Sequence, residues 1–444
     1  MSASTNQRGA STGASTGAST GELVIRGGTI LDRRGEQRGD VRVANGIVTE
    51  IGTSLRGDLE LDAGDCIVSP GFVDLHVHLR EPGREDAETV ETGSRAAARG
   101  GFTAIVAMPN TDPPHDTLAV VAMVRRLGEQ AGLCEVLPSG CITIGRKGET
   151  LAPFAELHAA GVQIFTDDGN GVQDPLLMRR ALEYGKSLGI TLAQHCEVSR
   201  LTQDAVMHEG GCCSRLGVPG WPSIAEELMV FRDIELCRLT GAPVHFLHLS
   251  TARAVDLVRA AKADGLSVTA EAAPHHFTLT DEALAGFDPI FKVNPPLRER
   301  SDVIAVKRGL ADGTIDAIAT DHAPHAPELK EMPLDQAPPG MLGLETALAL
   351  AISELDLDLQ QIVALLSWRP AVIAGVADRH GRNVEPGAPA NLTVFDANQT
   401  WTVASAGLAS KSRNTPYAGR HVRGRVRHTV FRGAAVVVDG EARR

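Results

Sequence analysis

Residues 71–86, GFVDLHVHLREPGRED, alternate between apolar and polar side chains along most of their length. Successive side chains of a β-strand point to opposite faces, so this alternation predicts a strand. Counted in twos, one face is wholly apolar and the other carries Phe72, Asp74, His76, His78 and Arg80. A strand facing solvent can carry such a polar face, so the rest of the chain has to decide whether it is functional.

Seven further strand-like apolar runs follow, with helix-like stretches between them. Together with the first strand they give eight β/α units, which predicts an α/β protein with a (β/α)8 TIM barrel. A doubly wound sheet is the alternative, but eight units and no early GxGxxG motif after a strand argue against it. The apolar runs cover residues 102–110, 135–145, 161–169, 190–197, 242–250, 266–276 and 315–325, and the helix-like stretches cover 117–130, 174–189, 225–239 and 251–265.

Both ends of the chain have a different texture, with short β-like pieces separated by glycine-rich turns. The pair Asn45-Gly46 is typical of a hairpin turn. Because this texture occurs at both ends, we expect the two ends to pair into one small β-sandwich. Before it lies a run of small residues, GASTGASTGASTG, which is predicted to be disordered because it cannot bury enough apolar surface. The predicted division is a tail at 1–21, a composite β-sandwich from 22–70 and 384–444, and a barrel at 71–383.

Histidine and aspartate collect where the predicted barrel strands end. In a (β/α)8 barrel the carboxyl ends of the strands form the active-site face. A chance scatter of core histidines would not select strand ends so consistently, so the polar face of 71–86 is interpreted as functional. The residues at these ends are His76, His78, Asp167, Asp168, His195, His248, His275, His276, Asp321 and His322.

Four histidines and two carboxylates that meet at one barrel mouth predict a transition-metal site. Imidazole with carboxylate suits zinc, and manganese, iron or cobalt can use similar ligands. Six ligands exceed what one tetrahedral ion with an open position needs, so we expect two ions that share a bridging carboxylate and a hydroxide. Asp321 follows an apolar run and precedes Ala-Pro, which favours it as the proton shuttle of such a site.

Composition narrows the class of protein. The 444 residues are 43% hydrophobic and 22% charged, as in an ordinary globular protein. A net charge of −12 without a long basic run argues against nucleic-acid or membrane-surface binding, and no apolar stretch reaches the roughly 18–20 residues of a membrane span. Seven cysteines without a CxxC pair suit free thiols in a reducing cytoplasm.

The motif set resembles the amidohydrolase superfamily, and within it the bacterial dihydroorotases of the long, non-animal-like class. The motifs are PGFVDLHVHLREPG, FTDDG, QHCE, HLS and TDHAPH, and the resemblance covers residues 22–444. It implies reversible cyclisation of N-carbamoyl-L-aspartate to L-dihydroorotate with loss of water, in pyrimidine biosynthesis. It also implies one or two zinc ions per chain, with two expected.

The same resemblance assigns roles to individual residues. His76 and His78 would bind the more buried metal, His195 and His248 the second, and Asp168 would bridge them. Asp321 would bind a metal and act as general base and acid. The substrate would contact His78, Arg80, Asn110, Asn294 and His325, and the loop at Pro339 and Gly340 would close near it.

The fourth strand departs from much of the superfamily. Hydantoinases, allantoinases and many dihydroorotases bridge their metals with a carboxylated lysine, whereas FTDDG supplies aspartate. Strand parity alone does not choose between Asp167 and Asp168, because one must face the lumen and the other the helices. The spacing found in the family selects Asp168.

Two other interpretations stay open. The chain could be another cyclic amidohydrolase, acting on hydantoin, dihydropyrimidine or allantoin, although Arg80 with Asn110 favours a substrate with a free carboxylate. It could also be a catalytically inactive scaffold for aspartate carbamoyltransferase, against which the intact ligand set argues. The expected partners are a small-molecule substrate and further copies of the chain, with a carbamoyltransferase complex left open.

Overall fold

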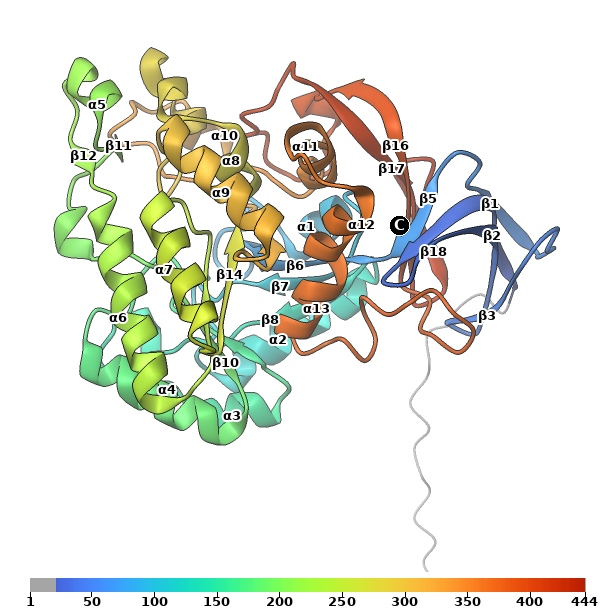
Figure 1. Ribbon diagram of the computed structural model, residues 1–444, viewed down its shortest axis with the longest axis horizontal. Helices are drawn as coiled ribbons and strands as arrows, with labels where there is room; N and C mark the ends of the chain where they lie inside the picture. The colour runs from blue at the N-terminus through green and yellow to red at the C-terminus, as the bar shows by residue number, and fades with distance from the viewer. Residues whose placement is uncertain (1–20, 444) are drawn as a thin grey trace, which may run out of the picture.

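The computed structural model describes residues 21–443, so the tail predicted at 1–21 lies outside the described residues except for Gly21. Eight parallel strands form a barrel surrounded by helices (Figure 1). The predicted strand runs each contain one of them. The barrel strands are β6 (Phe72–Val77), β7 (Phe102–Ala107), β8 (Glu135–Pro138), β9 (Ile164–Phe165), β10 (Thr191–Gln194), β13 (Val244–Phe246), β14 (Val268–Ala272) and β15 (Ala317–Ile318).

The barrel consists of two sheets that are joined at their edges. One has the order β15-β14-β13-β10-β9 and the other β6-β7-β8. Single parallel bridges, Val77 with His322 and Gly140 with Phe165, connect the two sheets on both sides. The ring is therefore closed, and the predicted (β/α)8 barrel is confirmed.

Several helices begin at a residue whose side chain accepts from free backbone N–H groups. In α4 (Pro175–Leu188) the Asp174 carboxylate accepts from the N–H groups of Leu176 and Leu177, and Gly189 ends the helix in the left-handed conformation. The remaining helices are α1 (Val90–Arg99), α2 (Leu118–Ala131), α3 (Phe154–Ala159), α5 (Gly211–Leu216), α6 (Ile224–Thr240), α7 (Ala252–Ala263), α8 (Pro274–Thr278), α9 (Arg300–Asp312), α10 (Pro327–Lys330), α11 (Ala347–Glu354), α12 (Leu359–Val363) and α13 (Arg369–Ile373). Of these, α1, α7 and α12 also begin at a residue whose side chain accepts in this way.

Both ends of the described chain contribute to one nine-stranded sheet beside the barrel (Figure 1). Strand β5 pairs antiparallel with β16, from Ile67 opposite Phe395 to Pro70 opposite Leu392. The predicted pairing of the two ends is therefore confirmed. The strands are β1 (Leu23–Asp32), β2 (Gly35–Ala44), β3 (Ile47–Gly52), β4 (Leu59–Asp62), β5 (Ile67–Pro70), β16 (Leu392–Thr402), β17 (His421–Phe431), β18 (Ala434–Val438) and β19 (Glu441–Ala442).

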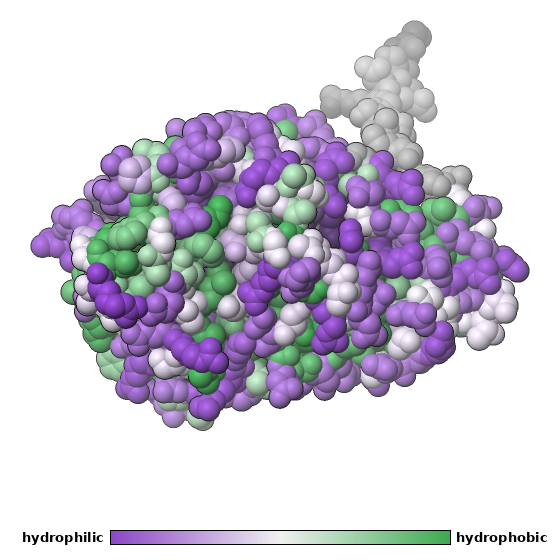
Figure 2. Space-filling view, turned by 90° about the horizontal axis from the view of Figure 1, so that it is seen from above, coloured by the Kyte–Doolittle hydropathy of each residue, from purple (hydrophilic) through white to green (hydrophobic). Residues whose placement is uncertain are grey.

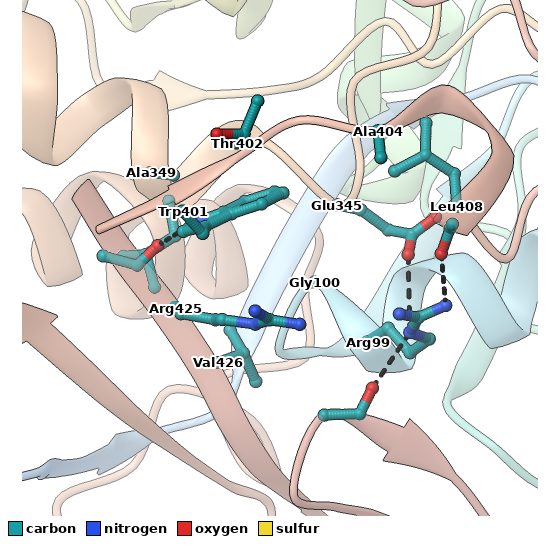
Figure 3. A pocket seen from close by; sticks show the side chains of 14 residues that line it. Arg99, Gly100, Glu345, Ala349, Trp401, Thr402, Ala404, Leu408, Arg425 and Val426 are labelled. Carbon is teal, nitrogen blue, oxygen red and sulfur yellow. Dashed lines mark hydrogen bonds and ion pairs between the residues drawn. The ribbon is translucent and has the colours of Figure 1, made fainter. Parts of the chain in front are cut away.

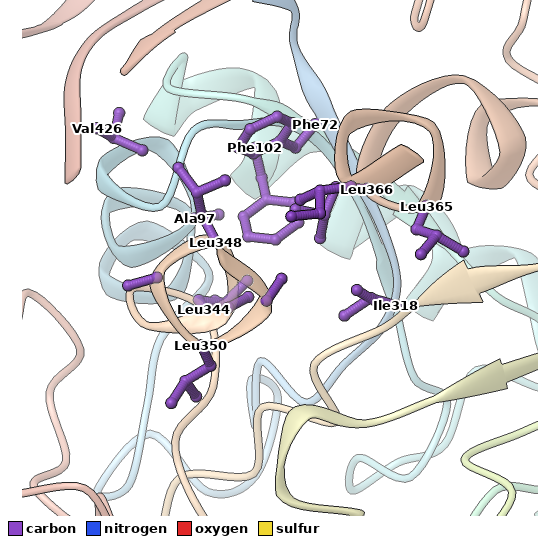
Figure 4. Close-up of a cluster of buried hydrophobic side chains, with 14 of the residues drawn as sticks. Phe72, Ala97, Phe102, Ile318, Leu344, Leu348, Leu350, Leu365, Leu366 and Val426 are labelled. Atoms are coloured by element: carbon purple, nitrogen blue, oxygen red, sulfur yellow. The ribbon is translucent and has the colours of Figure 1, made fainter. Parts of the chain in front are cut away.

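A cluster of buried aromatic and aliphatic side chains joins this sheet to the barrel. The rings of Phe72 and Phe102 meet edge to face with centroids 5.8 Å apart, and Leu348 and Leu366 lie beside them (Figure 4). Phe395 of β16 lies 6.0 Å from Phe72, measured between ring centroids. The first barrel strand is thus held at its amino end by the terminal sheet, which leaves its carboxyl end free for the site.

The strict alternation predicted for β6 is wrong in the first half of the strand. Pairing with β7 shifts register between Phe72 and Val73 and again between Asp74 and Val77. Val73 and Leu75 pack with side chains from β7 and β10 inside the barrel, whereas Phe72 packs outside among helices. A bulge changes which residues share a face, and two bulges separate the base of this strand from its end.

Candidate active site

Six of the predicted residues meet at the carboxyl ends of the barrel strands. His76 and His78 come from the end of β6, and the others follow β9, β10, β13 and β15. Each is at most 5% exposed. The Nε2 atom of His78 lies 3.1 Å from Asp321 Oδ1, and the Nδ1 atom of His195 lies 3.0 Å from the Nε2 atom of His248. The residues of this histidine–aspartate cluster are His76, His78, Asp168, His195, His248 and Asp321.

Asp168 lies at the centre of the cluster. Its Oδ1 atom is 3.4 Å from His76 Nε2, 3.3 Å from His195 Nδ1 and 3.5 Å from His248 Nε2. Its Oδ2 atom is 3.5 Å from His78 Nε2. Two groups of three potential ligands result, and they share Asp168.

These separations fit a transition-metal ion. Two ligand atoms about 2.0–2.1 Å from one tetrahedral zinc ion lie about 3.3 Å apart. His76 Nε2, which faces Asp168, is buried and makes no hydrogen bond within residues 21–443. A buried ring nitrogen without a partner is unusual, and a metal ligand lone pair accounts for it. The groups therefore fit metal binding by geometry and by donor chemistry.

The two aspartates after β9 point to different surroundings. Asp167 Oδ1 accepts from the backbone N–H groups of Ile142 and Thr143 at 2.9 and 3.0 Å, and Asp167 Oδ2 accepts from the Thr143 hydroxyl. Asp167 therefore holds the loop after β8, while Asp168 enters the cluster. The choice that parity left open depends on the backbone course after β9, which the sequence does not specify.

The carboxylates of the cluster are favoured in their ionised form. Burial raises the pKa of Asp168, but His76, His195 and His248 outweigh it and hold that pKa well below its usual value. Burial also raises the pKa of Asp321, but His76 and His78 outweigh this effect and hold that pKa below its usual value too. Ionised carboxylates are the form that binds metal.

Glu271 supports the cluster, and the sequence analysis missed it. It is fully buried near the end of β14, with Oε1 2.9 Å from His76 Nδ1 and Oε2 3.0 Å from His245 Nε2. Burial raises its pKa, but hydrogen bonds from His245 and His76 lower it to about 2. A carboxylate on the outer nitrogen of a ligand histidine fixes the ring orientation. The available signal was a glutamate inside an apolar strand, VTAEA.

Asp74 is a second support, and it holds backbone rather than a ring. Asp74 Oδ1 accepts from the N–H groups of His76 and Thr320 at 3.0 Å each, and Asp74 Oδ2 accepts from the Thr320 hydroxyl at 2.6 Å. Burial raises the pKa of Asp74 to about 7. The hydrogen bonds of Asp74 tie the end of β6 to Thr320. The next residue, Asp321, has a left-handed φ of +47°. Non-glycine residues in this conformation concentrate at functional sites.

Asn110, predicted as a substrate contact, also touches the cluster directly. Its Oδ1 atom is 2.9 Å from His78 Nδ1, so the ring nitrogen donates to the amide oxygen and the Nε2 lone pair faces the cluster. Glu197 acts in a similar way on His195, with its Oε2 atom 3.1 Å from the ring Nε2. The position of Asn110 leaves its amide N–H groups available for another partner.

Arg80 lies just beyond the cluster on the same segment. It is half-buried with a φ of +61°, and its Nε–H donates to the carbonyl of Pro324 at 3.1 Å. Burial lowers its pKa to about 10, so the guanidinium stays charged at neutral pH. The outer N–H groups of its fork remain available for a carboxylate.

The remaining predicted substrate residues lie on two other loops. His325 Nε2–H donates to the carbonyl of Pro339 at 2.8 Å, and a Cβ atom on Gly340, where φ is +139°, would come within 2.8 Å of that nitrogen. The close approach of this loop to His325 therefore requires glycine at 340. Asn294 is partly exposed and precedes Pro295, and its side chain makes no hydrogen bond among residues 21–443.

Two hollows differ in their relation to the cluster. One, of about 490 Å³, is lined by Asp167, Gly169 and Glu197, which are next to cluster residues. The other, of about 140 Å³, lies between α1, α11 and the terminal sheet, with Trp401 and an Arg99–Glu345 ion pair in its wall (Figure 3). No cluster residue lines either hollow, but only the first adjoins the cluster, at the barrel mouth.

The surface shows no large apolar band on the face seen in Figure 2, where hydrophilic residues surround separate apolar patches. Within the described part of the chain, every helix is too short or too polar to span a lipid bilayer.

Comparison with known proteins gives close relatives. A family model described as Dihydro-orotase-like matches residues 65–254. A dihydroorotase of Streptomyces coelicolor is 49% identical over 428 residues, covering 95% of this chain and 99% of the relative. The dihydroorotase of Mycobacterium tuberculosis is 48% identical (92% and 96% covered), and that of Geobacter sp. is 47% identical (94% and 100% covered).

Solved structures share the fold at lower sequence identity. An L-hydantoinase (dihydropyrimidinase) from Arthrobacter aurescens superimposes with a TM-score of 0.84 at 23% identity, covering 95% of this chain and 97% of that one. A D-hydantoinase from a Bacillus species gives a TM-score of 0.81 at 25% identity, covering 95% and 96%. Both the barrel and the sheet from the chain ends are included in these matches.

Proposed function

The chain belongs to the dihydroorotase family, and from that premise we propose how its own residues carry out the reaction. It is a metal-dependent cyclic amidohydrolase that interconverts N-carbamoyl-L-aspartate and L-dihydroorotate, with loss of water on ring closure, in de novo pyrimidine biosynthesis. The observation that carries the proposal is the pair of three-ligand groups sharing Asp168 at the barrel mouth. We assign the reaction to that place.

The proposed metal ligands are the six residues of the cluster, with zinc as the ion and two ions per chain. His76 and His78 would hold one ion and His195 and His248 the other, with Asp168 between them and Asp321 as a further ligand. Zinc in such a site acts as a Lewis acid that polarises a carbonyl group and acidifies water. Glu271 and Asn110 keep the lone pairs of His76 and His78 directed at the cluster.

Substrate binding is proposed for residues around the cluster. The open substrate has two carboxylates and the ring form has one, so a planar cation suits both. Arg80 supplies that cation and can grip a carboxylate with two parallel hydrogen bonds. Polar groups that can contact the remaining amide and carboxylate edges come from His78, Asn110, Asn294, His325 and the loop at Pro339 and Gly340.

Asp321 is the proposed proton carrier. Its Oδ1 atom is 3.1 Å from His78 Nε2 and 3.5 Å from His76 Nε2, so it lies against the ligands. In the direction of hydrolysis the ionised carboxylate accepts a proton from the attacking water and passes it to the departing nitrogen, and it then takes the second proton of that water from the new carboxyl group. Ring closure begins with the protonated carboxyl, because the departing oxygen leaves as water with one proton from Asp321 and one from the attacking nitrogen.

The direct test of this function is turnover by the purified, zinc-loaded protein. We expect hydrolysis of L-dihydroorotate and cyclisation of N-carbamoyl-L-aspartate, with little activity on hydantoin, dihydropyrimidine or allantoin. A preference for one of those other rings would replace the assignment with another cyclic amidohydrolase. A metal-loaded protein inactive on all of them, yet activating aspartate carbamoyltransferase, would identify a scaffold.

Arg80→Lys is expected to weaken substrate binding while zinc content stays unchanged. Lysine keeps the positive charge but lacks the planar guanidinium fork that can form two parallel hydrogen bonds with a carboxylate. Loss of a charge-assisted hydrogen bond costs about 1.5–3 kcal/mol, or roughly 10- to 100-fold in KM. Steady-state kinetics with metal analysis measures both quantities. The control is Arg84→Lys, because Arg84 is exposed and bonded to Asp86, and an unchanged KM in the Arg80 variant would contradict the role.

Glu271→Gln is expected to lower zinc affinity. The amide cannot accept from both His76 and His245 as the carboxylate does, and loss of such support typically costs about 10- to 100-fold in metal affinity. A competition titration against a chelator measures this. Glu135→Gln is the matched control. Glu135 lies outside the cluster, and its Oε2 atom is 2.8 Å from His380 Nε2. Equal zinc affinity in both variants would show that Glu271 is only a packing residue.

Assembly, location and domain limits are also proposals. We propose that the chain forms homo-oligomers in the cytoplasm and that a complex with aspartate carbamoyltransferase is open to test. Light scattering on the protein alone and mixed with the transferase distinguishes these assemblies. The proposed limits are 22–70 with 384–444 for the terminal β domain and 71–383 for the barrel, with 1–21 as a dispensable tail.

A further inference from the structure

Two adjacent histidines at the barrel mouth have no part in the proposed mechanism. His275 and His276 lie in α8, which begins directly after β14. Each is 2% exposed, and their ring centroids are 4.3 Å apart. Glu271, four residues before His275, bonds the cluster residue His76, so the pair lies at the same end of the barrel as the cluster.

The two rings differ in what they bind. His276 Nε2–H donates to the carbonyl of Pro295 at 3.0 Å, which holds the loop that carries Asn294. His275 Nε2 is buried and makes no hydrogen bond with any residue of 21–443. His276 is therefore explained as a loop anchor, and His275 is not explained by protein contacts.

A buried polar nitrogen without a partner needs an explanation, because nearly all such groups in proteins are bonded. Within the described residues, five buried histidines have such a ring nitrogen. That of His76 faces the cluster and is explained by the proposed metal site. The full set is His76, His115, His248, His275 and His276.

The surroundings of His275 connect it to the cluster. Burial lowers its pKa well below the usual value, and the neighbouring His276 adds to that effect. The cluster residues Asp321, His248 and His76 also act electrostatically on His275. His275 is thus a neutral imidazole, which has one N–H donor and one acceptor nitrogen.

We propose that His275 is a further substrate-contacting residue, whose Nε2–H donates to an oxygen of the substrate bound at the cluster. The proposal rests on the function proposed above. Carbamoyl-aspartate and dihydroorotate both present carbonyl and carboxylate oxygens, which are acceptors only. A neutral donor suits these oxygens because it adds no positive charge beside the ligand histidines, where a second cation would be repelled.

The test compares two variants of similar polarity. In His275→Gln the amide nitrogen reaches about as far as the histidine Nε2, whereas in His275→Asn it stops one bond short. We expect His275→Asn to weaken binding of orotate, a planar analogue of the ring product, by about 10- to 100-fold in calorimetry, with a similar loss in kcat/KM for dihydroorotate. We expect His275→Gln to stay within about threefold of the wild type, and zinc content to be unchanged in both.

His115→Asn is the matched control. His115 is buried and has an unbonded Nε2, but its Nδ1 bonds the carbonyl of Ser139 and the charged group acting on it is Asp116. This variant reports the general cost of shortening a buried histidine, and we expect its affinity for orotate to equal that of the wild type.

Each outcome decides the matter. Wild-type affinity and kcat/KM in His275→Asn would overturn the proposal, and so would loss of zinc from that variant, which would make His275 a metal ligand. Equal losses in the Gln and Asn variants would also overturn it, because they would show a packing role. A wild-type protein that neither binds orotate nor turns over dihydroorotate would instead contradict the proposed function.

Discussion

Removal of the bound metal is expected to abolish turnover in both directions. The cluster groups of the barrel mouth fit metal ions, and the proposed carboxylate clamp Arg80 cannot itself polarise the reacting carbonyl. Lewis-acid polarisation contributes several kcal/mol, so kcat/KM should fall by at least about a thousandfold. Dialysis against a chelator, followed by kinetics and elemental analysis, measures this loss, and added zinc should restore activity.

The metal-free protein should also be less stable. Binding to the native state alone stabilises it by RT ln(1 + [L]/Kd), about 4 kcal/mol at a ligand concentration of a thousand times Kd. The melting temperature should therefore fall on chelation and return with zinc. Circular dichroism of the chelated protein at a temperature well below melting is the control for fold. Full activity in protein that contains no metal would contradict the dinuclear interpretation.

The number of ions can be tested separately. His195→Ala removes a ligand from one group, Asp168 with His195 and His248, and leaves the other group intact. If two ions bind, this variant should lose about one ion per chain and keep the other. If the wild type binds one ion, the metal content of the variant shows which group holds it.

The barrel could be predicted from the sequence because its signals are local. Each strand is a short apolar run that ends in a polar residue, and helices such as α4 carry their own start and stop residues, Asp174 and Gly189. The chain ends could be paired because both have the same β-rich texture. Such signals identify elements and their order but not their exact register.

The register of β6 could not be predicted from the sequence. The regular alternation assigned to residues 72–80 assumes an unbroken strand, and two shifts against β7 turn Val73 and Leu75 into the barrel. A bulge depends on how a neighbouring strand packs, so it leaves no mark in the alternation itself. His76 and His78 nevertheless lie in the cluster at the end of the strand, His76 within the second shift and His78 after it.

The support of the cluster was also largely hidden. Glu271 and His245 are 26 residues apart in sequence, and Glu271 and His76 are 195 apart, so only folding brings them together. The role of Asn110 was seen as substrate contact alone, and its bond to His78 Nδ1 depends on the loop after β7. Sequence patterns identify polar residues at strand ends, whereas the contacts between residues of different strands are known only from the three-dimensional structure.

Asp321→Asn is expected to lower kcat/KM by at least about 10²–10⁴-fold in both directions. An amide neither accepts nor returns a proton, and it is also a weaker metal ligand than a carboxylate. Elemental analysis separates the two effects, because a variant that retains zinc and is inactive has lost the proton carrier. Asp316→Asn is the control from the same segment. The Asp316 carboxylate lies outside the cluster and accepts a hydrogen bond of 2.6 Å from Lys262 Nζ.

The two losses must be equal at any one pH. The ratio of kcat/KM for cyclisation to that for hydrolysis equals the equilibrium constant, which no substitution changes. Carbamoyl-aspartate carries two carboxylates and dihydroorotate one, so ring closure consumes a proton and this ratio falls tenfold for each unit of rising pH. A variant with unequal losses would therefore indicate an error in one assay rather than a property of the protein.

The pH profiles then identify the proton carrier. In the wild type the hydrolytic rate should rise with pH through one ionisation, because the carboxylate of Asp321 must be free to accept. The cyclisation rate should fall through a related one, because its protonated form must donate. In Asp321→Asn these opposite limbs should disappear from the residual kcat. If a zinc-containing Asn variant keeps both limbs, another group carries the proton, and His325, which lies against Pro339 and Gly340, is the first to replace next.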